Sequence, residues 1–294
     1  GEEGRYARAR TDEQGRIESH LPPGKWQAFV SHHARGESNV ALELHGGAYA
    51  SISAELPQAG YVTGVVTDDA GKPIPCKVDF SPQQEGLPAP EFGPDSAVYG
   101  VRNLVYTPDG QFRVAVRPGK YDLLISHGPE CDVANRTVDV AAGEVAEVAA
   151  QLRRSVETPG WVSTEYHSHS SPSGDNTASQ RGRVLNLLAE HLECAPCTEH
   201  NRIDTYDEHL EALGAKHRMT TCSGMELTGS PLLLNHQNAF PLVHRPHIQD
   251  GGGPTTDADP VTQITRLAMW DDGSDKLVQT NHPNIPQMLG DRDL

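Results

Sequence analysis

The chain lacks any hydrophobic run long enough to cross a membrane as a helix. Its longest apolar runs are short, such as residues 231–234, whereas a spanning helix needs about 18 or more apolar residues. The N-terminus has no charged segment followed by an apolar one, so no secretory leader is recognisable. It also has no initiator methionine, and we therefore expect a processed or cut chain.

Basic residues are scarce in this chain. It has 24 Lys and Arg against 40 Asp and Glu, which gives a net charge of −16. Sequence-independent binding to nucleic acid requires many basic side chains to neutralise phosphates. The charge balance therefore argues against a nucleic-acid partner. A length of 294 residues with 36% hydrophobic residues is typical of a soluble globular protein with about two domains.

The five cysteines form an odd set, which excludes a complete disulfide framework. Cys76 and Cys131 lie in one predicted domain and either form a disulfide or remain two unpaired thiols. Cys194 and Cys197 form a C-A-P-C motif, which is also found in redox and zinc sites. A second C-x-x-C is missing, so we interpret these two cysteines as part of a strand core.

Several catalytic motifs are also missing. The chain contains neither the G-x-S-x-G of serine hydrolases nor the G-x-x-x-x-G-K of phosphate-binding loops. After residue 160 its only lysines are Lys216 and Lys276, and neither stands at the end of a predicted strand. This disfavours a metal site bridged by a modified lysine.

An internal repeat is the clearest feature of the first half. Residues 15–33 (GRIESHLPPGKWQAFVSHH) align without a gap to residues 110–128 (GQFRVAVRPGKYDLLISHG). In both copies alternating apolar residues lie on either side of a Pro-Gly-Lys turn, which predicts two strands joined by that turn. An exit strand follows at residues 42–44 and 138–140. The repeat therefore predicts tandem antiparallel β-sandwiches.

The second copy is preceded by GYVTGVVTDDAGKPIPCKVDF at residues 60–80, which predicts a strand, a turn and a second strand. This pattern and the later Pro-Gly-Lys-Tyr resemble the carboxypeptidase-regulatory-like domain, a structural module of many secreted bacterial proteins. Only fourteen residues precede the first copy, so we expect its opening strands to be absent. We assign residues 1–56 to a partial sandwich and residues 57–157 to a second sandwich.

Helical and strand-like patterns alternate after residue 160. Apolar spacing predicts helices around residues 184–192, 206–213 and 261–268, the last with Asp259 as its N-cap. The strand-like runs between these helices are CAPCT at 194, RMTTCS at 218, LLNHQNAF at 233 and KLVQTN at 276. This alternation predicts an α/β domain of parallel strands covered by helices.

Ten of the fifteen histidines also lie after residue 160. His167 and His169 are separated by one residue, and on a strand such positions point to the same face. An H-x-H pair alone is also common as two surface histidines. Further histidines stand at or beyond predicted strand ends, with carboxylates among them: His200, His236, His282, Asp175, Glu199 and Glu226. Imidazoles and carboxylates are the ligands of zinc, manganese and iron.

Five motifs in a fixed order carry a resemblance to a known family. They are H-S-H followed by S-G-D, then T-E-H-N, G-M-E, N-H-Q-N-A-F and N-H-P. In this order they resemble the PHP (polymerase and histidinol phosphatase) superfamily, and most closely its carbaryl-hydrolase-like branch (CehA/McbA). The resemblance covers residues 161–294 and implies a distorted (βα)7 barrel. We therefore expect residues 158–294 to form the N-terminal part of a PHP barrel.

The resemblance also implies roles for individual residues. The implied metal ligands are His167, His169, Asp175, His200, Glu226, His236 and His282, and the implied catalytic residues are His167, His169, Glu226 and His236. His167, His169 and Glu226 would share a first metal, and Glu226 would bridge to a second. Two or three zinc, manganese or iron ions would be bound per site.

The chain departs from the family in four places. Glu199 replaces the usual Asp of T-D-H, Glu165 is the acidic residue before H-x-H, and the spacing from His169 to Asp175 is longer by one residue. The late Asp-x-His of the family is absent, since Asp291 and Asp293 have no histidine beside them. We therefore expect a barrel that is incomplete at its C-terminus.

These residues together predict a metal-dependent hydrolase that acts on a small phosphoester through an activated water. The alternatives are a carbamate or carboxylic ester hydrolase and a non-catalytic binding protein with a decayed site. In a glycine-rich loop, His244, Arg245 and His247 are candidate substrate contacts. The sandwich modules favour a periplasmic, cell-surface or secreted location over the cytoplasm.

Overall fold

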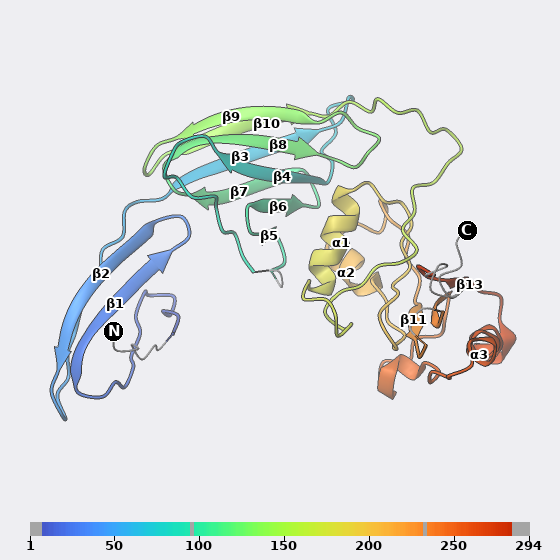
Figure 1. The fold of residues 1–294 in the computed structure, drawn as a ribbon. Helices are drawn as coiled ribbons and strands as arrows, with labels where there is room; N and C mark the ends of the chain where they lie inside the picture. Colours follow the sequence, from blue (N-terminus) through green and yellow to red (C-terminus); the bar gives the residue numbers. More distant parts are fainter. Residues whose placement is uncertain (1–7, 95–96, 232–233, 284–294) are drawn as a thin grey trace, which may run out of the picture. The chain divides into compact units, whose positions relative to one another are not determined.

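The computed structural model describes residues 8–94, 97–231 and 234–283, and its helices and strands are drawn in Figure 1. The chain divides into two compact units, Gly1–Pro57 and Gln58–Leu294. The domain boundary that we predict at residues 157 and 158 lies inside the second unit and stays a prediction.

The first unit contains one β-hairpin. Its strands β1 (Gly24–His32) and β2 (Gly36–Leu44) pair antiparallel, with Trp26 opposite Leu42. The sequence predicts a strand before the Pro-Gly-Lys turn, but residues 15–21 form none. In the second copy of the repeat the equivalent strand pairs with an earlier strand. Among the described residues of the first unit no such earlier strand exists, so this segment has no edge to join.

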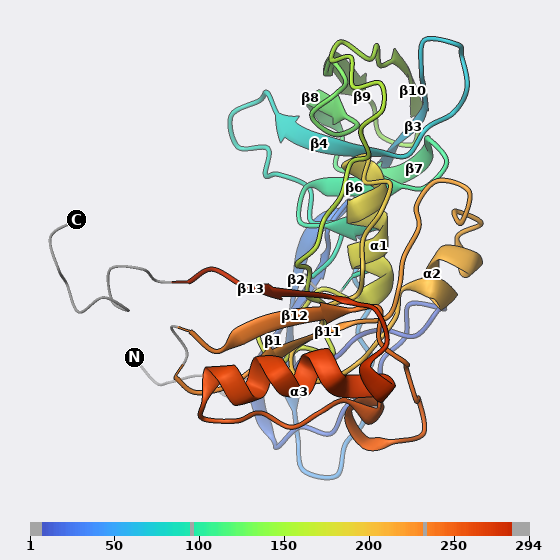
Figure 2. The same ribbon diagram turned by 90° about the vertical axis from the view of Figure 1, so that its right-hand side faces the viewer.

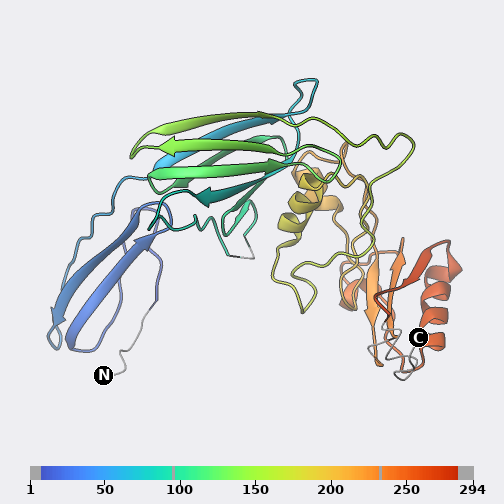
Figure 3. The same ribbon diagram turned by 45° about the horizontal axis from the view of Figure 1, so that its top comes forward.

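The second unit begins with a β-sandwich. Its strands are β3 (Gly60–Thr67), β4 (Cys76–Pro82), β5 (Gly100–Val101), β6 (Leu104–Thr107), β7 (Gln111–Val116), β8 (Gly119–Ser126), β9 (Ala134–Val140) and β10 (Val145–Gln151). They form a three-stranded sheet of order β10-β3-β7 and a five-stranded sheet of order β5-β6-β4-β8-β9 (Figure 3). Only β10 and β3 pair in parallel. The predicted turn between β7 and β8 and the exit strand β9 are confirmed.

The core of the sandwich is aromatic at its centre. Phe80 is fully buried, and its ring makes edge contacts with the rings of Phe92, Phe112 and Tyr121. All five cysteines are free. Cys76 is buried in this core and does not form a disulfide with Cys131.

After the sandwich, three segments run parallel to one another. Isolated bridges join Thr164 to Cys194, Cys194 to Thr220, and His200 to Glu226. Helix α1 (Gln180–Ala189) connects the first segment to the second, and the short helix α2 (Asp207–Ala212) connects the second to the third. The segments therefore lie side by side, although they do not form a regular sheet.

The last sheet is antiparallel. It contains β11 (Met225–Thr228), β12 (His236–Phe240) and β13 (Leu277–Thr280), in that order. A 3-10 turn η1 (Gln249–Gly252) and helix α3 (Pro260–Gly273) lie between β12 and β13. Helix α3 covers one face of the sheet (Figure 2), where Leu267 packs against residues of β11 and β12. Asp259 caps α3 by accepting the Thr262 N–H at 2.9 Å, which confirms the predicted N-cap.

The expected (βα)7 barrel is wrong. After the sandwich, the described residues form one antiparallel three-stranded sheet and two helices longer than two turns, α1 and α3. The fold therefore does not support a PHP-barrel hydrolase. The physical reason is the connection at residues 229–235. It is much shorter than the dozen or more residues that a parallel crossover needs, so β12 returns beside β11 in the opposite direction.

Candidate metal centre

Glu226 is the centre of a histidine cluster. On β11 its neighbours Met225 and Leu227 pack toward α3, so Glu226 points to the opposite face, where it is 0% exposed. Its Oε2 atom lies 3.3 Å from His167 Nε2, 3.2 Å from His169 Nε2 and 3.1 Å from His200 Nδ1.

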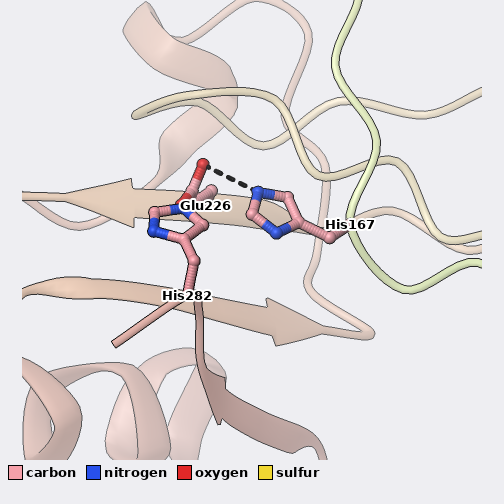
Figure 4. A group of neighbouring side chains, drawn as sticks. All are labelled: His167, Glu226 and His282. Atoms are coloured by element: carbon pink, nitrogen blue, oxygen red, sulfur yellow. Dashed lines mark ion pairs between the residues drawn. The ribbon is translucent and has the colours of Figure 1, made fainter. Parts of the chain in front are cut away.

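The second carboxylate oxygen faces a different set of side chains. Glu226 Oε1 lies 3.1 Å from His236 Nδ1 and 3.6 Å from His282 Nε2, and it accepts a hydrogen bond of 2.9 Å from Asn281 Nδ2. Figure 4 shows the rings of His167 and His282 next to this carboxylate. Five imidazoles therefore surround one buried carboxylate.

Strand register brings several of these residues together. In the β11–β12 pair Glu226 is opposite Asn238 and Thr228 is opposite His236, so all four side chains share one face of the sheet. His200 reaches the same place because it bridges Glu226 in parallel. The sheet thus has an apolar face against α3 and a polar face that carries the cluster.

His167 and His169 come from an extended segment that is not part of a sheet. Their Nε2 atoms lie 2.9 Å apart, while Ser168 between them points away and contacts the Tyr206 hydroxyl at 3.0 Å. The two imidazoles therefore meet on one side of the chain, as their spacing predicts.

The cluster is open on one side. Asp175 Oδ2 lies 3.1 Å from His200 Nε2, and the side chains of Asp175 and His282 are both 57% exposed. Among the described residues, two groups of three have ligand atoms within 4.8 Å of one another: His167, Glu226 and His282, and His169, Asp175 and His200. All seven residues that we expect as ligands are thus close together. His167 and His169 belong to different groups, however, whereas we expect them to share one metal.

Electrostatics keep the central carboxylate charged. Burial alone would raise the pKa of Glu226, but its contacts with His167, His169 and Asn281 outweigh burial and hold the pKa well below its usual range. Burial lowers the pKa of His169, yet its contact with Glu226 and the charge of Asp175 leave that pKa raised overall.

The donor set fits a divalent metal ion. Within the described part of the chain, His236 Nε2 is buried and has no hydrogen-bond partner. Glu226 Oε2 is buried 3.1–3.3 Å from three imidazole nitrogens, but it is not aligned for a hydrogen bond with any of them. Two ligands bound tetrahedrally to zinc at about 2.1 Å are about 3.4 Å apart. The separations of 3.1–3.6 Å around Glu226 match that spacing.

A buried network supports the cluster from behind. Glu199 is 0% exposed and accepts hydrogen bonds from the Ser170 amide, the Ser170 hydroxyl and the Ser173 hydroxyl. Glu199 is among the carboxylates expected near the histidines, whereas Ser173 and Asn281 are not among the predicted site residues. The signal for both is their place in the motifs S-G-D and N-H-P, where each stands next to or near an expected ligand.

The candidate substrate loop lies elsewhere. Arg245 pairs with Asp271 at 2.8 Å, and a side chain placed at Gly253 of the same loop would meet Met225, which is on the α3 face of the sheet. The structure therefore does not bring His244, Arg245 and His247 to the polar face that carries Glu226. Their role as substrate contacts stays a prediction.

A cavity of about 380 Å³ adjoins the cluster. It is bounded by the segment of His167 and His169, by Arg183 and Leu187 of α1, and by Pro129 of the sandwich. This volume is within the range of small-molecule sites, which is about 300–1,000 Å³.

Comparisons with known proteins do not identify a family for this chain. No family model and no curated protein matches the chain, and no described helix is both long and apolar enough to span a bilayer. Among solved structures, a minor pilin of the Gram-positive pathogen Streptococcus agalactiae is similar at 15% identity, over 52% of this chain and 69% of that chain, with a TM-score of 0.27. A streptococcal ancillary pilin is similar at 11% identity over 46% of each chain, also with a TM-score of 0.27. Both likenesses are too weak to identify a family or a function.

Proposed function

We propose that the cluster around Glu226 binds two divalent metal ions and that the protein is a metal-dependent hydrolase of a small ester, with a phosphoester as the favoured substrate. One observation carries the proposal: a fully buried carboxylate lies among five imidazoles, and three imidazole nitrogens lie 3.1–3.3 Å from its Oε2 atom. The motif resemblance to the PHP superfamily supports the ligand set, although not the barrel.

Each group of three would hold one ion. His167, Glu226 and His282 would bind the first, and His169, Asp175 and His200 the second, with Glu226 close enough to contact both. Zinc, manganese and iron all accept this mixture of nitrogen and oxygen ligands. When bound, such ions lower the pKa of a water molecule toward about 7 and polarise the ester group.

The chain's own residues would orient the site. His236 and Asn281 hold Glu226 Oε1, which leaves Oε2 directed at His167, His169 and His200. The exposed side chain of Asp175 lies at the open edge of the cluster, so an ion that it helps to bind would face an approaching substrate.

A carbamate or carboxylic ester is the second candidate substrate. One observation favours it: Arg245, which we expect to face a substrate anion, pairs with Asp271. A neutral ester would not need that arginine. We also expect the protein to act in the periplasm, at the cell surface or outside the cell, which cell fractionation would test.

Two measurements test the proposal. The metal content of the purified protein is determined by mass spectrometry, and hydrolysis of an aryl phosphomonoester, an aryl phosphodiester, an aryl ester and an aryl carbamate is assayed with zinc, manganese and iron(II). Metal together with turnover of one ester supports the proposal. Metal without any turnover identifies a non-catalytic binding protein, and a protein that binds no added metal overturns the site itself.

A further inference from the structure

The hydroxyl of Ser173 joins the two segments that carry His169 and His200. It donates a hydrogen bond of 2.5 Å to Glu199 Oε2. It also lies 3.2 Å from His169 Nδ1 and accepts the backbone N–H of His200 at 2.9 Å. One oxygen atom therefore contacts a buried carboxylate and both histidine segments.

The direction of these hydrogen bonds follows from the protons available. Ser173 has a single hydroxyl proton, which it donates to Glu199 Oε2. Toward His169 the Ser173 oxygen must then accept, which places a proton on His169 Nδ1. In the neutral imidazole the other nitrogen, Nε2, carries the lone pair. Nε2 lies 3.2 Å from Glu226 Oε2, so an ion between the two atoms would contact both.

We propose that Ser173, anchored by Glu199, is a positioning residue that selects Nε2 of His169 as the metal-binding atom and fixes His200 beside it. This inference rests on the proposed metal site. An outer hydrogen-bond partner of this kind commonly fixes the tautomer and ring orientation of a metal-binding histidine. Here the partner is a hydroxyl with a buried carboxylate behind it.

Further contacts fix the positions of Glu199, His169 and His200. Glu199 receives three hydrogen bonds from Ser170 and Ser173, which satisfies a carboxylate that would be costly to bury alone. Arg183 of α1 donates to the carbonyl oxygen of His169 at 2.8 Å. The rings of His169 and His200 stack, with centroids 4.3 Å apart and an interplanar angle of 17°.

Ser170 provides a matched control. Its hydroxyl also donates to Glu199, but no hydrogen bond joins it to a histidine within the described residues. Ser170→Ala therefore removes support from Glu199 alone, whereas Ser173→Ala removes the same kind of support and the contact with His169. Ser173→Thr retains a hydroxyl and should restore the wild-type behaviour.

The experiment has two readouts. The tautomer of His169 is measured by ¹⁵N NMR of the imidazole in metal-free protein, at a pH where the ring is neutral. The affinity for zinc is measured by competition with a chromophoric chelator. We expect Ser173→Ala to shift His169 away from the Nδ1–H tautomer and to weaken zinc binding roughly 10- to 100-fold. We expect Ser170→Ala to keep the tautomer and to weaken binding less.

Two results would overturn the inference: an unchanged His169 tautomer in Ser173→Ala, or equal losses of affinity in both alanine variants. If Ser173→Ala does not fold, Ser173→Cys, whose sulfur is a weak acceptor, is measured in the same way. If the wild-type protein binds no zinc, the proposed function fails, but the NMR readout still decides the role of Ser173.

Discussion

His236 Nδ1 and Glu226 Oε1 lie 3.1 Å apart on neighbouring antiparallel strands. This contact turns the imidazole so that its other nitrogen, Nε2, is buried without a partner among the described residues. Leaving a buried polar atom unsatisfied costs about 1–3 kcal/mol. The cost has a ready explanation if His236 Nε2 is directed at a ligand that completes the cluster.

We expect Glu226→Gln to lose most of the bound metal, because the amide removes the charge that lies nearest to all five imidazoles. The measurement is metal stoichiometry after dialysis. Glu208→Gln, which changes an exposed carboxylate on α2, is the control and should retain the wild-type content. Glu199→Gln should cause a smaller loss than Glu226→Gln, since Glu199 contacts serines and no histidine ring. Equal losses would identify Glu199 as a ligand.

We expect His167→Ala and His169→Ala each to lower metal content and any activity together, while the sandwich stays folded. The sandwich core and the cores beside the cluster contain no residues in common. Circular dichroism and metal analysis check both parts of this prediction. His217→Ala, an exposed histidine outside the cluster, should change neither. Wild-type stoichiometry in both cluster variants would rule out the assignment.

His127 gives a pH-dependent contribution to stability. Its side chain is buried against His191, with ring centroids 4.6 Å apart. Burial, and then the charges of His191 and Arg218, lower the pKa of His127 from 6.5 to about 4. Between these values the unfolded chain binds a proton that the folded chain does not, so stability falls as the pH drops from 6.5 toward 4, by roughly 3 kcal/mol in total.

Urea unfolding at both ends of that pH window, with a chelator present, checks the prediction. His127→Phe keeps a ring of similar size but cannot take up a proton, so its unfolding free energy should lose this part of the pH dependence. His217→Phe should keep it. An unchanged pH dependence in His127→Phe would contradict the assignment.

We expect Phe80→Ala to destabilise the sandwich by about 3–5 kcal/mol, because it leaves a cavity among three aromatic rings. Chemical denaturation measures the loss. Phe29→Ala, on a side chain that is 71% exposed, should change stability little. A loss near zero for Phe80→Ala would mean that these rings repack around the gap.

Local features of this protein were predictable from the sequence because they depend on neighbours in the chain. The alternation of Phe112 and Val116 on β7, the turn before β8 and the cap of Asp259 on α3 all follow from backbone geometry within a few residues. The same reasoning placed His167 and His169 on one side of an extended segment. The resemblance of the motif order to the PHP superfamily, and not a local rule, pointed to His200, Glu226 and His236 as partners.

Only the tertiary structure decided how these pieces combine. The pattern of alternating strands and helices does not specify strand direction, and the short connection after β11 made β12 antiparallel where a parallel barrel strand was expected. The sequence suggested that Arg245 contacts a substrate, but in the folded chain Arg245 forms an ion pair with Asp271. The contact of Ser173 with His169 and the burial of His127 likewise join residues that local rules cannot relate, because side-chain contacts across the fold depend on packing and not on sequence spacing.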